Sequence, residues 1–204
     1  MEWLRAENIK KTFKGREVLK SCSLTVLGGE VLCLIGPSGY GKSTLLEILV
    51  GIQEESSGKV IREGEVSFMF QDNALIPWLS AERNLRYILP RTWSKELIEE
   101  KTSFWLERFH LEKATRPPEM SGGMRRRLSL ARTFILERPI VVLDEPFAFL
   151  DRYWHSRVSE IFNELALKSM CVIIAGHFVN PELLEECGER LRVIKIEESP
   201  VNIP

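Results

Sequence analysis

The stretch "VLCLIGPSGYGKSTLLEILVG", residues 31–51, decides the fold. Its apolar start predicts a buried strand, and its end, "STLLEILVG", has the pattern of an amphipathic helix. Between them lies G-x-x-x-x-G-K-S, a spacing typical of loops that hold phosphate groups at a helix N-terminus. A glycine-rich turn without a ligand would leave the pair Lys42 and Ser43 without a purpose. We therefore predict a phosphate-binding loop, in which Lys42 reaches the β- and γ-phosphates and Ser43 binds Mg²⁺.

Further short apolar runs predict the rest of a sheet. They are "VSFMF" at 66–70, "IVVL" at 140–143, "CVIIA" at 171–175 and "RLRVIKI" at 190–196. Helical patterns separate most of these runs, which favours an α/β fold around a largely parallel sheet. The final residues, "EESPVNIP", are expected to form a frayed tail.

Residues 73–118 differ from this alternating pattern because they contain two helical segments with no strand between them. These segments are "SAERNLRYIL" at 80–89 and "SKELIEEKTSFWLERFHL" at 94–111, and Ser80 and Ser94 are expected to cap them. We interpret the region, about 73–120, as a helical insertion within a single domain that spans 1–204.

A second glycine-rich helix start occurs in "EMSGGMRRRLSLART", residues 119–133. The Ser121 hydroxyl can donate to a phosphate, and Gly122 and Gly123 leave room for an anion at the positive end of the helix. Arg125–Arg127 are expected to form a solvated face rather than to contact nucleic acid. The apolar residues on one face of the helix are expected to anchor it on the core: Met124, Leu128, Ala131 and Ile135.

Polar residues follow several predicted strands. Asp144 and Glu145 end the run "IVVLDEP", where they could hold Mg²⁺ and deprotonate an attacking water. His177 comes directly after another predicted strand, at the edge of a parallel sheet where ligands bind, whereas Gln71 follows "VSFMF" and, as a loop glutamine alone, carries no information. Taken alone, His177 could be an ordinary loop histidine and Phe13 a core residue.

Composition sets broad limits. The chain has 204 residues, is 44% hydrophobic and 28% charged, and has a formal net charge of −1, which gives no electrostatic case for nucleic-acid binding. No apolar run approaches the roughly 18 residues that span a bilayer. The four cysteines show no C-x-x-C spacing, and Cys22, Cys33 and Cys171, which lie in or beside apolar runs, are expected to be buried thiols rather than metal ligands; this fits a reducing cytoplasm.

The order of these motifs resembles that of the ATP-binding subunits of ABC transporters over nearly the whole chain. "GPSGYGKST" at 36–44 resembles their Walker A motif and "IVVLDEP" at 140–146 their Walker B motif. "ALIPWLSAERNL", 74–85, is similar to importers of the nitrate, sulfonate and taurine type. The other matches are the Q-loop at 70–80, the signature sequence at 120–132, the D-loop at 147–151 and the H-loop at 176–177.

The resemblance implies a head-to-tail dimer, of this chain or with a similar subunit, that encloses two ATP molecules. Each ATP would lie on the Walker A motif of one subunit and under the signature sequence of the other. The implied Mg²⁺ ligands are Ser43, Gln71 and Asp144, and the implied catalytic groups are Glu145 as general base, Gln71, His177 and Lys42. The implied nucleotide contacts are Phe13, Gly36, Pro37, Ser38, Gly39, Gly41, Lys42, Ser43, Thr44, Ser121, Gly122, Gly123 and Asp151.

The sequence departs from the family pattern at several points. Met124 replaces the usual Gln after the signature glycines, and Phe178 replaces the usual Asp after His177. Ala148 and Phe149 stand where Ser and Ala are common in the D-loop. The span from the Walker A motif to the Q-loop is short, so we expect a trimmed antiparallel β-subdomain beside the P-loop NTPase core.

The implied function is ATP hydrolysis that powers an ABC membrane transporter from the cytoplasmic face of the membrane. The segment 74–85 implies that this transporter is an importer. Transmembrane permease subunits are expected to dock near Gln71, Ile76 and Trp78. The alternative is an ATP-gated clamp or regulatory ABC ATPase, although such proteins usually carry long coiled-coil or zinc insertions. "MSGG" and the lack of N-K-x-D count against a P-loop kinase or GTPase.

Overall fold

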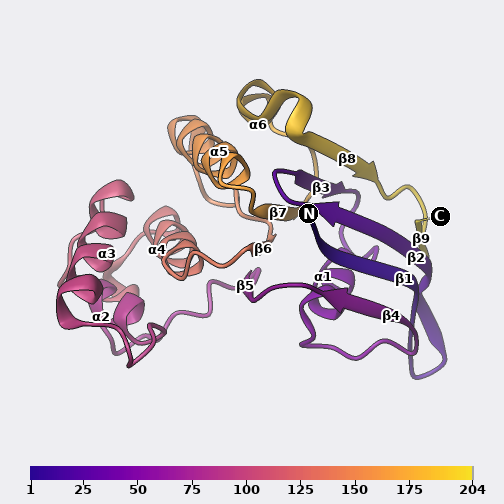
Figure 1. The fold of residues 1–204 in the computed structure, drawn as a ribbon, viewed down its shortest axis with the longest axis horizontal. Coiled ribbons are helices and arrows are strands. Elements are labelled where there is room, and N and C mark those ends of the chain that lie inside the picture. The colour runs from indigo at the N-terminus through magenta and orange to yellow at the C-terminus, as the bar shows by residue number, and fades with distance from the viewer. Residues whose placement is uncertain (204) are drawn as a thin grey trace.

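A computed structural model describes residues 1–203 and places them in two sheets with helices packed on them (Figure 1). The larger sheet is fully parallel and has the strand order β5-β6-β7-β3-β8. The strands predicted from the apolar runs all form, within a residue or so of their expected bounds. They are β3 (Val31–Ile35), β5 (Val66–Met69), β6 (Ile140–Asp144), β7 (Cys171–Gly176) and β8 (Leu191–Lys195).

The parallel sheet is buried on both faces because consecutive residues of a strand point to opposite sides. In β3, Val31 and Cys33 belong to one core, and Leu32 and Leu34 belong to the other. The first core is built with α4 (Gly122–Phe134) and α5 (Arg152–Leu167). The second core is built with α1 (Lys42–Val50) and the smaller sheet.

The smaller sheet has the order β4-β1-β2-β9. β1 (Glu2–Phe13) pairs antiparallel with both β2 (Arg16–Leu27) and β4 (Ser57–Arg62). The prediction of a frayed tail is wrong, because β9 (Val201–Ile203) pairs in parallel with β2 and buries Val201 and Ile203. That this sheet is trimmed relative to other family members stays a prediction.

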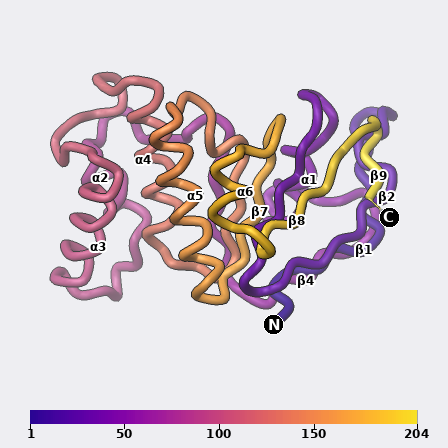
Figure 2. The backbone as a smooth tube through the Cα atoms, turned by 90° about the horizontal axis from the view of Figure 1, so that it is seen from above, coloured from indigo at the N-terminus to yellow at the C-terminus, as the bar shows by residue number. Residues whose placement is uncertain are grey.

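The helical region lies at the end of the molecule opposite the smaller sheet (Figures 1 and 2). It contains α2 (Ala81–Arg86), α3 (Lys95–Arg108) and the short η1 (Pro117–Glu119). Ser80 and Ser94 cap the two helices as predicted, each accepting a backbone N–H three residues on. The remaining elements are α6 (Pro181–Cys187) and η2 (Gly188–Arg190).

Two further sequence predictions concern the cysteines and membrane-spanning segments. All four cysteines are free and buried, as expected for Cys22, Cys33 and Cys171, and burial raises the pKa of each thiol. Within residues 1–203, no helix is both long and apolar enough to cross a membrane.

Candidate active site

The predicted site residues lie at the ends of four parallel strands, at one edge of the large sheet. β3 leads into the glycine-rich loop, β5 into Gln71, β6 ends at Asp144, and β7 leads into His177. Because the carboxyl ends of parallel strands meet at the same edge, residues far apart in sequence come together. This edge borders a cleft of about 510 Å³, whereas Asp144 and His177 line two neighbouring cavities. The cleft is lined by Phe13, Arg16, Val18, Ser38, Gly39, Gly41, Lys42, Ser43, Thr44, Gln71, Glu145 and Ser199.

Two glycines of the loop are required by its geometry. Gly41, which precedes α1, has a φ of 87°, and a Cβ there would lie 2.9 Å from the Cγ1 atom of Val18. A Cβ on Gly36 would lie 2.5 Å from the carbonyl oxygen of Ile196. Any other residue at either position would force the loop away from its neighbours, so the phosphate-binding shape depends on both glycines.

Lys42 begins α1 and is held against its own loop. Its Nζ donates to the carbonyl oxygens of Gly36 at 2.7 Å and Pro37 at 2.8 Å. Burial lowers the pKa of Lys42, while the charges of Glu145 and Asp144 oppose that shift. The ammonium group therefore lies in the cleft wall, where a phosphate could replace the two carbonyl oxygens.

Asp144 and Ser43 supply oxygen atoms suited to a divalent cation. Asp144 is only 4% exposed, and burial raises its pKa while a hydrogen bond with Ser43 opposes the rise. Within residues 1–203, no group of three or more His, Cys, Asp or Glu side chains could hold a metal by itself. This donor set fits Mg²⁺, which typically takes one or two protein oxygens together with substrate phosphates.

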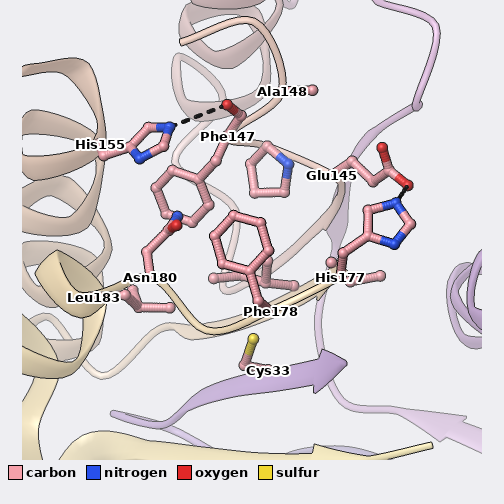
Figure 3. Close-up of a pocket in the computed structure, with 13 residues that line it drawn as sticks. Cys33, Glu145, Phe147, Ala148, His155, His177, Phe178, Asn180 and Leu183 are labelled. Carbon is pink, nitrogen blue, oxygen red and sulfur yellow. Dashed lines mark hydrogen bonds and ion pairs between the residues drawn. The ribbon is translucent and has the colours of Figure 1, made fainter. Parts of the chain in front are cut away.

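Glu145 and His177 form a pair beside this site. Glu145 Oε1 lies 3.0 Å from His177 Nε2, and Figure 3 shows the two side chains turned toward each other. The Glu145 backbone is left-handed, with a φ of 52°, which turns its side chain out of the direction of β6. The pair borders a small, mainly apolar pocket of about 130 Å³ with Phe147, Phe178 and Leu183 in its wall (Figure 3).

The predicted nucleotide contacts from the second glycine-rich helix start are not brought into this cleft. Among the described residues, neither Ser121, Gly122 and Gly123 nor Asp151 lines it. Ser121 caps α4 by accepting the Met124 N–H at 3.1 Å. Asp151 caps α5 in the same way, accepting the N–H of Trp154 at 3.0 Å. The helix start at Ser121 exists as predicted, but its phosphate-facing role cannot be served within the same cleft.

The D-loop lies directly against the second helix start. Phe149 is 76% exposed, and a Cβ on Gly122 would make ordinary contact with it at 3.5 Å. A Cβ on Gly123 would come within 3.0 Å of the Phe149 carbonyl oxygen. Gly123 is therefore needed for close packing, whereas Gly122 has room for a side chain.

The prediction that Arg125–Arg127 form a solvated face is wrong. Arg126 is fully buried. Its neighbours are half-buried, and Arg125 donates to the Met120 carbonyl at 2.7 Å while Arg127 donates to that of His110 at 3.2 Å. Sequence reasoning missed Arg126, since an arginine between two others in a helix gives no signal of burial. The anchoring face was predicted correctly: Leu128, Ala131 and Ile135 are buried, and Met124 packs against them.

Comparison with known proteins agrees with this fold and set of motifs. The family described as ABC transporter matches residues 19–148, and the chain belongs to the ATP-binding subunits of that family. It is therefore an ATP-hydrolysing subunit that powers transport.

Relatives of known name are close in sequence. The chain is 35% identical over 180 residues to the aliphatic sulfonates import ATP-binding protein SsuB 1 of Pseudomonas savastanoi pv. phaseolicola, covering 85% of this chain and 73% of that one. It is 34% identical over 182 residues to SsuB of Bacillus licheniformis, covering 84% and 70%. The solved dimer of MJ0796, a bacterial ABC transporter cassette, is 25% identical with a TM-score of 0.83, covering 98% and 100%.

Proposed function

We propose that this chain is the ATPase subunit of an importer and works as a head-to-tail dimer, with itself or a similar subunit, on the cytoplasmic face of the membrane. The observation that carries the dimer is the separation of the two glycine-rich helix starts. The first lines the cleft with Lys42, whereas Ser121 is exposed outside it. A second subunit placed head to tail would bring its Ser121 over this cleft. The importer direction is supported by the relatives named for sulfonate import.

The chain as a whole is proposed to be one ABC ATPase domain, 1–204, with a helical subdomain at about 73–120. ATP would lie in the cleft with its phosphates on the 36–44 loop. Mg²⁺ would be held by Ser43, Asp144 and Gln71, and it would neutralise charge on the phosphates. Lys42 would bind the β- and γ-phosphates. Glu145 would accept the proton of the attacking water, with Gln71 and His177 near the γ-phosphate.

Phe13 is proposed to stack on the adenine. It ends β1, is 40% exposed, and lines the cleft with the Lys11 Nζ 4.8 Å from its ring centroid. Phe13→Ala should weaken ATP and GTP binding alike, by about fivefold or more, because stacking of a base on an aromatic ring is worth about 1–3 kcal/mol and discriminates little between purines. Fluorescence titration with both nucleotides measures this. Phe13→Trp, which keeps an aromatic face, should bind within about twofold of wild type, and an unchanged affinity in Phe13→Ala would mean that Phe13 does not stack on the base.

The loop of residues 71–79 is proposed to dock the transmembrane permease subunits. Trp78 is 73% exposed, and Ile76 is half-buried beside it. The loop is held in shape by the fully buried Asn84, which accepts the Ile76 N–H at 2.9 Å and donates to the carbonyls of Ile76, Leu79 and Ser80. A large apolar side chain on a preformed loop is typical of an interface anchor.

Trp78→Ala should leave ATP binding by the isolated subunit unchanged but reduce assembly with the membrane partner by about tenfold or more, as expected for an aromatic anchor. Affinity purification of the tagged chain from membranes, with quantification of co-purifying polytopic subunits, measures assembly. Tyr153→Ala removes an aromatic ring that is 53% exposed on α5, outside the loop, and serves as the matched control. Full assembly by the Trp78 variant would remove this docking site. Absence of any polytopic partner for wild type would favour the clamp alternative.

A further inference from the structure

Helix α4 is buried on two opposite faces. The apolar face anchors it on the core, and the opposite face carries Arg126, Ser129 and Thr133 at helical spacing, all buried. This polar face is turned to the Q-loop: Ser129 Oγ donates to the Asn73 carbonyl at 3.1 Å, and Arg132 donates to the same oxygen at 3.2 Å. The helix that starts at the signature sequence is thus hydrogen-bonded to the Q-loop of its own chain.

Arg126 bridges two segments of the candidate site. Its Nη1 donates to the carbonyl oxygens of Phe70 at 3.2 Å and Gln71 at 3.1 Å and to Asn73 Oδ1 at 3.2 Å. Its Nη2 donates to the carbonyl oxygens of Asp144, at 2.7 Å, and Glu145. One guanidinium group therefore holds both the segment that carries Gln71 and the segment that carries Glu145.

These contacts lie beyond the end of the β5–β6 ladder, while the Glu145 segment stays attached to β7 on its other side, where the Glu145 N–H donates to the Ala175 carbonyl at 2.9 Å. The β5–β6 ladder runs from Val66 opposite Ile140 to Met69 opposite Leu143. Beyond Met69 the Q-loop turns away, and beyond Asp144 the backbone becomes left-handed. Beyond that point, the hydrogen bonds of Arg126 connect the two segments in place of the β5–β6 ladder. The planar, forked guanidinium suits this role because its two terminal nitrogens can each contact a different segment.

The fully buried charge is stabilised mainly by carbonyl dipoles. Burial lowers the pKa of Arg126 to about 10, with the charges of Asp144 and Glu145 opposing the shift, so the group stays charged at neutral pH. Burying a charge is costly unless polar partners surround it. Five hydrogen bonds satisfy the two terminal nitrogens, whereas the buried Nε has no partner among the described residues. All five end on two segments, so movement of one segment against the other would break some of them.

We propose that Arg126 is a positioning residue for ATP hydrolysis: it fixes the spacing of Gln71 and Glu145, and it ties that spacing to the helix that carries Ser121. The second half rests on the proposed head-to-tail dimer. There, Ser121 at the start of α4 would contact the ATP of the partner subunit. Arg126 lies just over one helical turn further on, so a shift of α4 on that contact would change the position of Glu145 in its own site.

The test uses the full chain with Arg126→Lys and Arg126→Gln. Arg138→Gln is the matched control, because Arg138 donates to the Val66 carbonyl at 2.7 Å, at the end of the β5–β6 ladder away from the site. Lysine keeps the charge but loses the fork, so it cannot hold both segments as arginine does. Single-turnover ATP hydrolysis should slow by about tenfold or more in both variants, while ATP affinity stays within about threefold. The Arg138 variant should match wild type. A role in stability alone would leave kcat of the folded fraction unchanged, so wild-type kcat in folded Arg126→Lys overturns the proposal.

Two further measurements keep the test decisive. In the Glu145→Gln background, Arg126→Lys should slow hydrolysis no further, because both changes act through the same group, whereas independent effects would add. Additive slowing would overturn the proposal.

If both Arg126 variants fail to fold, Asn73→Ala removes one acceptor without touching the buried charge; it should lower kcat by severalfold, and a wild-type kcat would then overturn the proposal. If Glu145→Gln alone fails to dimerise with ATP, the proposed dimer is wrong and the coupling to α4 falls with it, while the kcat test of the Gln71–Glu145 spacing still stands.

Discussion

Glu145→Gln is expected to bind ATP with near wild-type affinity and to hydrolyse it about 10²- to 10⁴-fold more slowly, the usual contribution of a general base. The amide has the same shape as the carboxylate, and its oxygen can still accept from His177 Nε2, which lies 3.0 Å from Glu145 Oε1. The left-handed backbone at this position is equally open to glutamine. What the variant loses is the ability to take a proton from water. Steady-state release of phosphate with Mg–ATP, together with an equilibrium ATP titration, separates the two effects.

The matched control is Glu47→Gln. Glu47 lines the neighbouring cavity together with Asp144 and Glu145, so its substitution removes a similar charge from nearly the same place. It should keep turnover within about threefold of wild type, because Glu47 lies on α1 and is not placed beside His177. If Glu145→Gln also stays within about threefold, Glu145 is not the general base. If it loses ATP affinity in proportion to turnover, its role is binding instead.

The predicted site residues that the structure brings together are those whose sequence signals are local. A glycine-lysine-serine loop needs only its own spacing to be recognised, and apolar runs that end in Asp144 or lead to His177 mark strand ends by themselves. Parallel pairing then places these ends together, as the shared cleft of Lys42, Gln71 and Glu145 shows.

The parts that were missed depend on contacts between distant segments. Arg126 looks solvated in sequence, and only the closeness of β5 and β6 creates the carbonyls that bury it. The strand β9 is three residues long and forms only because β2, about 180 residues earlier, offers an edge with the spacing of Leu19 to Cys22. Short segments of this kind gain their structure from tertiary pairing rather than from propensity.

Gly122→Asp is expected to abolish ATPase activity while leaving ATP binding to the P-loop of the same chain nearly unchanged. A Cβ at Gly122 meets Phe149 at an ordinary 3.5 Å, and a carboxylate at a helix N-terminus does not oppose the helix dipole, so the chain should fold. In a head-to-tail dimer, however, that carboxylate would face the triphosphate bound by the partner subunit, and repulsion would prevent closure. Gly122→Asn has nearly the same size without the charge, so it should lose clearly less activity. Phosphate release and ATP titration on both variants measure the difference.

Mixing variants decides whether Ser121 acts on the other subunit. Lys42→Ala should also be inactive, because it removes the ammonium group that the loop holds in the cleft wall. A mixed dimer of Gly122→Asp and Lys42→Ala subunits would contain one site with an intact P-loop and an intact signature sequence, and one doubly broken site. Activity should therefore return on mixing, and ATP-bound Glu145→Gln crystals should show Ser121 Oγ within hydrogen-bond distance of a γ-phosphate held by the partner's P-loop. A closed dimer in which Ser121 contacts the nucleotide of its own chain, or none, would contradict the shared site even if mixing restored activity by another route.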